Sequence, residues 1–348
     1  MQGIERGFFV RYALLLKPHA NVRYRQSLQK LALIELKCML SAWGMENAEP
    51  QWQMLCGEPF LVFETDDMTN EAWREISRHS AVCLAAELME NGQLRPIERN
   101  VQSLLPDDLP HVLKYKGKTN ADFTYMMLHC AKAASAFAHE EGPLRVLDPM
   151  CGKATTLFCA MCEGNDAVGV ETDMKSLQEA STYYTRFLKL HMLKHRVKES
   201  SHTLSKGGSA HLITYEAAAD AQSMKEGRSI HLDLFNGDAA RLSEMVKPGS
   251  CHLIVSDLPY GVQHAPRENG GMSALGRLVA RVTPGCVKAL KKGGALAFSF
   301  NLNTLRRKEV EKILSDAGLE VLALPPYDDF SHWVEQAVDR DVVIARKP

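Results

Sequence analysis

The most informative segment of the chain reads Leu253-Ile254-Val255-Ser256-Asp257-Leu258-Pro259-Tyr260-Gly261. Its apolar start predicts a buried strand of a parallel sheet, so the residues that follow fall at the strand's carboxyl end, where open α/β sheets bind ligands. Asp257 and the carbonyl of Leu258 can accept hydrogen bonds from an amine, and Tyr260 can stack on a flat ring. Pro259 stiffens the turn. Asp, Pro and Gly are also common in turns, so this segment alone leaves an ordinary turn equally open.

The composition is that of a globular protein without a global attraction to polyanions. The 348 residues allow two domains, 45% of them are hydrophobic and 24% are charged. The formal net charge is −1, so a nucleic-acid partner would have to be held by local basic patches. No signal segment or membrane-spanning apolar run is expected. The nine cysteines favour reduced thiols in the cytoplasm, and Cys159 and Cys162 are expected to be buried in a helix, with no metal site.

Two domains and a linker are predicted. Residues 1–95 alternate strand and helix patterns in the manner of a small α/β, ferredoxin-like domain, with strands expected at 8–16 and 60–63 and helices at 24–42 and 70–88. A proline-punctuated linker is expected at 96–115.

Residues 116–348 are expected to form an α/β domain with a doubly wound, mostly parallel, seven-stranded Rossmann-like sheet. The strands are predicted at 145–147, 167–170, 230–234, 252–255, 295–300, 320–324 and 341–345. Helices are predicted at 121–138, 155–163, 175–195 and 304–317, and before residue 290. The polar stretch 199–228 has no clear period and is interpreted as an exposed, partly mobile insertion.

Three further strand ends carry residues suited to an adenosine-bearing ligand. In Asp148-Pro149-Met150-Cys151-Gly152, a strand turns into a helix, and the glycine allows close approach to free helix N–H groups. Glu171 follows Gly152 by 19 residues and suits ribose hydroxyls. Asp238, in Asn236-Gly237-Asp238, could accept from an adenine amine. Each alone is as consistent with a cap or turn, but all of them at successive strand ends indicate a binding site.

The nucleotide is expected to lack a pyrophosphate. The first turn has one glycine where a dinucleotide fingerprint has G-x-G-x-x-G, and the chain contains no G-x-x-x-x-G-K-[ST] loop. A cofactor without phosphates fits better, and S-adenosylmethionine is the candidate.

These segments, with Gly169-Val170-Glu171-Thr172-Asp173, resemble a class I S-adenosylmethionine-dependent methyltransferase. The Asp-Leu-Pro-aromatic segment is similar to that of RNA methylases that include tRNA guanosine-N2 methyltransferases, which often carry a THUMP domain. The resemblance covers roughly residues 112–348. The segment 118–124 resembles the one that closes over the methionine end of the cofactor, and the N-terminal unit resembles the small domain that precedes THUMP.

The resemblance implies direct methyl transfer to an exocyclic amine of a nucleobase in RNA, with guanine N2 in tRNA favoured. The implied catalytic residues are Asp257, Leu258, Pro259 and Tyr260. The implied cofactor-binding residues are Phe123, Thr124, Asp148, Met150, Cys151, Gly152, Glu171, Thr172, Asp238, Ala239 and Asp257. RNA would be held by basic residues in two runs, which could equally be solvated faces: Lys189, His191, Lys194, His195, Arg196 and Lys198, and His111, Lys114, Lys116 and Lys118.

Two departures from the family pattern keep other functions open. The first motif continues Gly152-Lys153-Ala154-Thr155 where the family has Gly-Ser/Thr-Gly-Thr, and the linker is too short to hold a THUMP domain. The acceptor could instead be an adenine or cytosine amine in DNA or another RNA, or a glutamine amide. A catalytically degraded cofactor-binding or RNA-binding protein, and a subunit that needs a small activating partner, are further alternatives.

Overall fold

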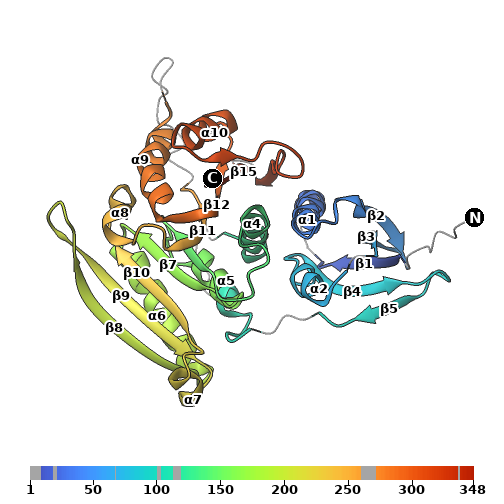
Figure 1. Cartoon of the computed structure of the whole chain (residues 1–348), viewed down its shortest axis with the longest axis horizontal. Helices are drawn as coiled ribbons and strands as arrows, with labels where there is room; N and C mark the ends of the chain where they lie inside the picture. The colour runs from blue at the N-terminus through green and yellow to red at the C-terminus, as the bar shows by residue number, and fades with distance from the viewer. Residues whose placement is uncertain are drawn as a thin grey trace, which may run out of the picture. The chain divides into compact units, whose positions relative to one another are not determined.

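The computed structural model describes residues 9–18, 22–66, 68–99, 103–112, 119–259, 272–335 and 338–348. The chain divides into two compact units, Met1–Gln102 and Ser103–Pro348. Figure 1 shows that both contain a β-sheet with packed helices.

The N-terminal unit is built on a five-stranded antiparallel sheet with the order β2-β3-β1-β4-β5. Its strands are β1 (Val10–Leu16), β2 (Gln51–Leu55), β3 (Glu58–Thr65), β4 (Val82–Leu88) and β5 (Leu94–Ile97). Its helical elements are α1 (Val22–Ala42), the 3-10 turn η1 (Glu46–Ala48) and α2 (Asn70–Ile76). Tyr12, Leu14, Leu61 and Phe63 alternate along β1 and β3 and pack in one core with Leu36 and Ile76 of the helices, as the period of two along a strand requires.

The prediction of helix through residues 82–88 was wrong. Ala, Leu and Glu favour a helix in that stretch. The segment is instead β4, and Tyr12↔Glu87 and Leu14↔Ala85 are among its antiparallel pairings with β1. Long-range pairing therefore overrides local propensity here.

The larger unit contains a ten-stranded mixed sheet with the order β13-β15-β12-β11-β6-β7-β10-β9-β8, and β14 pairs with β15 off this path. Its strands are β6 (Arg145–Asp148), β7 (Asp166–Glu171), β8 (Lys194–Thr203), β9 (Ser209–Ala218), β10 (Ile230–Asn236), β11 (Cys251–Asp257), β12 (Leu290–Asn301), β13 (Glu320–Val321), β14 (His332–Glu335) and β15 (Val338–Arg346).

The centre of this sheet is parallel, because β12, β11, β6, β7 and β10 all run the same way. The pairings of β8, β9, β13, β14 and β15 are antiparallel. The prediction of a mostly parallel, seven-stranded sheet was therefore correct for the centre and wrong for the edges and the number of strands.

The insertion after the predicted helix 175–195 is an ordered β-hairpin, so the expectation of an irregular stretch at 199–228 was wrong. β8 pairs with β9 over its whole length, from Lys194↔Ala218 to Thr203↔Ser209, and β9 pairs with β10. Most side chains of β8 are exposed. A strand that buries neither face lacks the apolar alternation by which strands are recognised, which explains the error.

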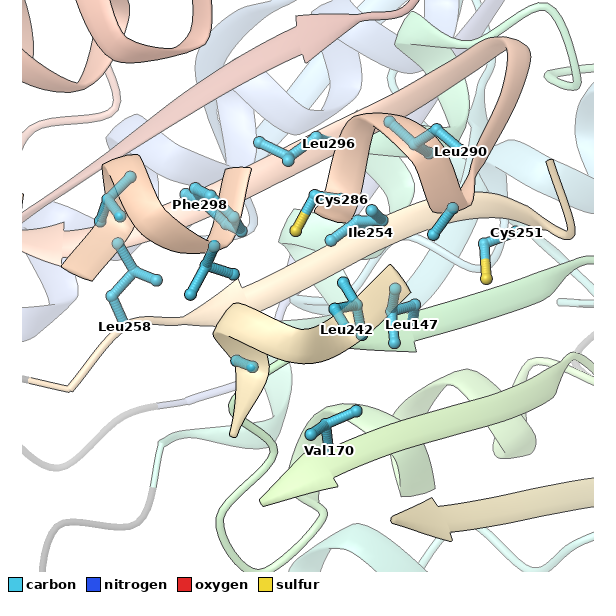
Figure 2. Packing of buried hydrophobic residues seen from close by; sticks show 14 of the residues in the cluster. Leu147, Val170, Leu242, Cys251, Ile254, Leu258, Cys286, Leu290, Leu296 and Phe298 are labelled. Carbon is cyan, nitrogen blue, oxygen red and sulfur yellow. The ribbon is translucent and has the colours of Figure 1, made fainter. Parts of the chain in front are cut away.

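Helices cover both faces of the larger sheet (Figure 1). They are α3 (Leu109–Val112), α4 (Ala121–Ala134), α5 (Thr155–Cys162), α6 (Met174–Leu190), α7 (Ala221–Lys225), the 3-10 turn η2 (Ala239–Arg241), α8 (Leu242–Met245), α9 (Ala274–Ala289) and α10 (Arg307–Asp316). One core joins α8, α9 and α10 to the sheet, and another joins α3, α5 and α6 to it. Figure 2 shows Ile254 and Phe298 of the central strands, and Leu242 and Cys286 of the helices, within the first core. Each such fully buried leucine, isoleucine or phenylalanine contributes about 1.5–3 kcal/mol to the stability of the fold.

None of the helices in the described ranges is both long and apolar enough to cross a membrane.

Candidate active site

A cavity of about 490 Å³ opens at the carboxyl ends of β6, β7, β10 and β11. These strands are neighbours in the sheet, in the order β11-β6-β7-β10, so their ends meet along one edge. Four carboxylates from these ends line the cavity: Asp148, Glu171, Asp238 and Asp257. The lining thus carries four carboxylates against one lysine, Lys153, and this balance of charge favours a cationic ligand over a polyphosphate.

Asp148 is the most buried of the four carboxylates, with 2% of its surface exposed. Its Oδ1 accepts hydrogen bonds from the Ser256 hydroxyl, at 2.7 Å, and the Met150 N–H, at 3.1 Å. Burial, with a smaller contribution from the negative charge of Asp257, raises the pKa of Asp148 to about 6, against the effect of these bonds and one from Thr156. A cationic group in the cavity would stabilise the ionised form of Asp148.

The loop after Asp148 reaches α5 through two residues with left-handed backbone conformations. Gly152 has φ +51°, and Ala154, the N-cap of α5, has φ +68°. A glycine is the usual residue at such angles, and Ala154 shows that the smallest side chain is tolerated here. The Lys153 ammonium forms an ion pair with Glu179 of α6, so its positive charge is compensated beside the cavity.

Glu171 links this loop to the end of β7. Its Oε2 accepts the N–H of Gly152, at 2.8 Å, and its Oε1 accepts the N–H of Asp173, at 2.8 Å, and the hydroxyl of Thr172, at 3.2 Å. A carboxylate offers about four lone-pair sites, so Glu171 keeps the capacity to accept from a ligand hydroxyl.

Asp238 stands two residues beyond β10 and caps η2. Its Oδ1 accepts the N–H of Ala240, at 2.9 Å, while its Oδ2 lies 3.1 Å from Nη2 of Arg281 on α9. Gly237 allows this turn to pack closely, since a Cβ there would come within 2.6 Å of the Met245 sulfur. Its N–H donates to the carbonyl of Glu171, which ties the two strand ends together.

Asp257, the last residue of β11, is held by side chains that are distant in sequence. Its Oδ2 accepts a hydrogen bond from the Thr119 hydroxyl and lies 3.5 Å from Nη2 of Arg340 on β15. The backbone N–H of Leu258 donates to the carbonyl of Ser299, at 2.9 Å, which fixes the chain as it leaves the strand.

Most of the predicted site residues lie around this cavity. The lining includes Asp148, Met150, Cys151, Gly152, Glu171, Thr172, Asp238, Ala239, Asp257, Leu258 and Pro259. Tyr260 lies outside the described residues. Phe123 and Thr124 are buried in the first turn of α4 and are not among the lining residues. The ring of Phe123 instead faces Arg340, whose guanidinium carbon lies 4.6 Å from the ring centre.

Sequence reasoning missed further lining residues: Thr119, Pro149, Lys153, Thr155, Thr156, Val170, Ser176, Gly237 and Leu278. Several of them belong to the motifs already singled out and could have been included by extending each motif by one or two positions. Thr119 lies in the segment 118–124 that resembles the one closing over the cofactor, but it was not named as a site residue; Asn120 caps α4 by accepting the Asp122 N–H. Nothing in the sequence around Leu278, on α9, indicates that this residue lines a cavity.

No family model matches the chain. No curated protein matches it either.

Solved structures resemble the fold only distantly. A TehB-like S-adenosylmethionine-dependent methyltransferase from Corynebacterium glutamicum is 12% identical, with a TM-score of 0.36 over 65% of this chain and 87% of that one. Magnesium protoporphyrin IX methyltransferase from Synechocystis, with bound cofactor, is 13% identical, with a TM-score of 0.38 over 69% and 90%. TYW2 from Pyrococcus horikoshii, in complex with MeSAdo, is 12% identical, with a TM-score of 0.37 over 76% and 70%. TM-scores this low leave the function to be judged from the cavity.

Proposed function

We propose that this chain is an S-adenosylmethionine-dependent methyltransferase that acts on an exocyclic amine of a nucleobase in RNA, with guanine N2 in tRNA as the target. One observation carries the proposal. Four neighbouring strands each place a carboxylate at their carboxyl end in the lining of one cavity: Asp148, Glu171, Asp238 and Asp257. Ligands of open α/β sheets bind at such an edge.

The cavity residues fit S-adenosylmethionine. Glu171 would accept from the ribose hydroxyls, Asp238 would accept from the adenine amine, and the loop at Gly152 would lie against the amino-acid end. The buried carboxylate of Asp148 would offset the cofactor's positive charge. When bound, the cofactor supplies an electrophilic methyl group on a sulfonium. Neither departure at Lys153-Ala154 obstructs this fit, because Lys153 pairs with Glu179 and Ala154 adopts the backbone conformation of a glycine.

The acceptor end of the cavity suits an amine. The Asp257 carboxylate and the Leu258 carbonyl would orient the amine hydrogens and stabilise the positive charge that develops on nitrogen during transfer. Tyr260 would stack on the base, as the resemblance implies. Asp257 stands where enzymes that act on adenine, cytosine or glutamine amines often carry asparagine, and this favours guanine.

RNA binding is supported by exposed cations on the hairpin edge of the sheet. Lys194, Arg196 and Lys198 occupy alternate positions of β8 and therefore project from the same face. Arg196 pairs with Glu216 across the hairpin, at 3.0 Å, so part of this charge is compensated. Contacts of these cations with RNA phosphates would make the affinity for RNA fall as the salt concentration rises.

We also propose that the N-terminal unit is a ferredoxin-like domain that docks RNA, and that the protein acts in the cytoplasm. The strand order β2-β3-β1-β4, with α1 after β1 and α2 after β3, supports the first point, since it is the order of a split βαββαβ unit.

The test is methyl transfer from deuterium-labelled S-adenosylmethionine to unmodified tRNA transcripts, followed by digestion and mass spectrometry of the nucleosides. The expected product is labelled N2-methylguanosine. Label on a ribose oxygen, on a ring nitrogen, or on no nucleoside at all would contradict the proposal.

A further inference from the structure

A buried arginine lies against the carboxylate of Asp257. Arg340 belongs to β15 and is 5% exposed, and its Nη2 lies 3.5 Å from Asp257 Oδ2. β15 pairs with β12, not with β11. Arg340 therefore reaches Asp257 from a strand that is not its neighbour in the sheet. Burying a guanidinium is costly unless a partner compensates its charge, and the Asp257 carboxylate is a partner that does so for Arg340.

The guanidinium is also held from the side of α4. The ring of Phe123 lies 4.6 Å from the guanidinium carbon, at the distance of a cation–π contact, and the ring of His332 lies 5.2 Å from that of Phe123. Phe123 is 2% exposed, so this aromatic contact is shielded from water. The resemblance implies that Phe123 binds the cofactor, and the structure places its ring against the guanidinium of Arg340.

The same end of α4 supplies a second contact to Asp257. Thr119, immediately before the helix cap, donates its hydroxyl hydrogen to Oδ2, the oxygen that Arg340 also faces. Two groups from separate elements therefore hold one oxygen of this carboxylate. With a cation and a hydroxyl donor on it, Asp257 acts as a hydrogen-bond acceptor and fixes one orientation in the cavity.

We propose that Arg340 and Thr119 are positioning residues that fix the Asp257 carboxylate as an acceptor for the substrate's N–H groups. This inference rests on the proposed function and adds a reason for its substrate class. A carboxylate held in this way recognises a group that donates hydrogens, such as an exocyclic amine, and rejects a carbonyl edge or an unprotonated ring nitrogen. Phe123 supports Arg340 and does not touch the substrate.

The experiment compares Arg340→Met, Arg340→Lys and Thr119→Val in the full chain, each alone and combined with Asp257→Ala. Two quantities are measured: the single-turnover rate of methyl transfer to unmodified tRNA transcripts, and the dissociation constant of S-adenosylmethionine by calorimetry. Arg346→Met is the matched control, since Arg346 is on the same strand and pairs with Glu320 at the exposed edge.

Arg340→Met is expected to lower the rate about 30- to 100-fold, as loss of one partner of a buried charged pair does, with cofactor affinity unchanged within about threefold. Arg340→Lys is expected to be faster than Arg340→Met and slower than the wild type. Thr119→Val is expected to lower the wild-type rate about tenfold. In the Asp257→Ala background neither residue's substitution has a further effect, because both act through that carboxylate. If Arg340→Met folds poorly, Thr119→Val and Arg340→Lys, each with and without Asp257→Ala, test the same positioning role.

Equal losses with and without Asp257 would overturn the positioning role, as would a fall in cofactor affinity that parallels the fall in rate. If the wild-type protein methylates no nucleobase amine, the proposed function is overturned before any variant is compared. The positioning role then falls with it.

Discussion

The two ends of the cavity are built in different ways. At the cofactor end, Asp148, Glu171 and Asp238 each accept the backbone N–H of the residue two positions further on. At the acceptor end, Asp257 is held by Thr119, 138 residues away in sequence, and by Arg340 of β15. Local turns thus recur throughout the cofactor end, where the Ser256 hydroxyl adds a long-range bond to Asp148, whereas Asp257 at the acceptor end is held by side chains that meet only when α4, β11 and β15 come together.

This difference predicts how the two ends respond to substitution. Changes at the acceptor end should affect the rate and spare cofactor affinity, because Thr119 and Arg340 make their contacts there with Asp257. Changes at the cofactor end should affect affinity, because the local turns hold the groups that face the nucleoside.

The largest effect is expected for Asp257→Ala. Removing the acceptor of the amine hydrogens should lower the single-turnover rate at least about 1,000-fold, since such groups act on charge that develops in the transition state. The dissociation constant of S-adenosylmethionine, measured by calorimetry, should stay within about threefold of the wild-type value. Retained turnover would refute the role assigned to Asp257.

Glu171→Ala should produce the opposite pattern. Losing the acceptor for ribose hydroxyls, and for the Gly152 and Asp173 N–H groups, is expected to weaken cofactor binding about 10- to 100-fold by calorimetry. Glu320→Ala, at an exposed ion pair, is the control. Unchanged affinity would remove Glu171 from the cofactor site.

Asp148 should make cofactor binding depend on pH. Burial raises the pKa of Asp148 to about 6, and a cationic ligand binds the ionised form, so affinity should fall about tenfold between about pH 7 and pH 5. Titrations of Asp148→Asn should lack this dependence. A wild-type profile that is flat over the same range would show that Asp148 does not face the positive charge.

Without a ligand, the raised pKa of Asp148 makes the folded state less stable as the pH rises. Because the pKa of Asp148 in the folded state is above its ordinary value of 3.8, its contribution to stability is full below that value. The contribution is lost as the pH rises through about 6. Denaturant unfolding of the wild type and Asp148→Asn, compared across this range, measures the effect.

The smallest effect is expected for Arg281→Ala. Arg281 and Asp238 form an ion pair with side chains 62% and 47% exposed, and such pairs contribute little in water. Cofactor affinity should change by less than about threefold. A larger loss would mean that Arg281 itself contacts the nucleoside, and the cofactor end would then depend on a second distant side chain besides Ser256.

The sequence predicted the features that depend on neighbours along the chain. Each of Asp148, Glu171 and Asp257 ends a buried strand, and the apolar run before it places it at one edge of a parallel sheet, where the cavity is found. Asp238 follows the same logic at β10.

What the sequence did not predict depends on contacts between distant segments. Arg340 was overlooked because nothing near it in sequence marks a buried cation, and the contact of Thr119 with Asp257 was overlooked because it joins residues 138 positions apart. The strands β4 and β8 were missed because pairing partners, not periodicity, make them strands. Position in the sheet, and not residue type, decides such cases.

The central claim is that four carboxylates at neighbouring strand ends form a site for S-adenosylmethionine. Calorimetric titration of the wild-type chain with S-adenosylmethionine tests it most directly, with a nicotinamide dinucleotide as the comparison ligand. The account predicts one binding site for S-adenosylmethionine, with a dissociation constant on the order of micromolar, and no binding of the dinucleotide. No heat of binding with S-adenosylmethionine at about 1 mM, or tighter binding of the dinucleotide, would contradict it.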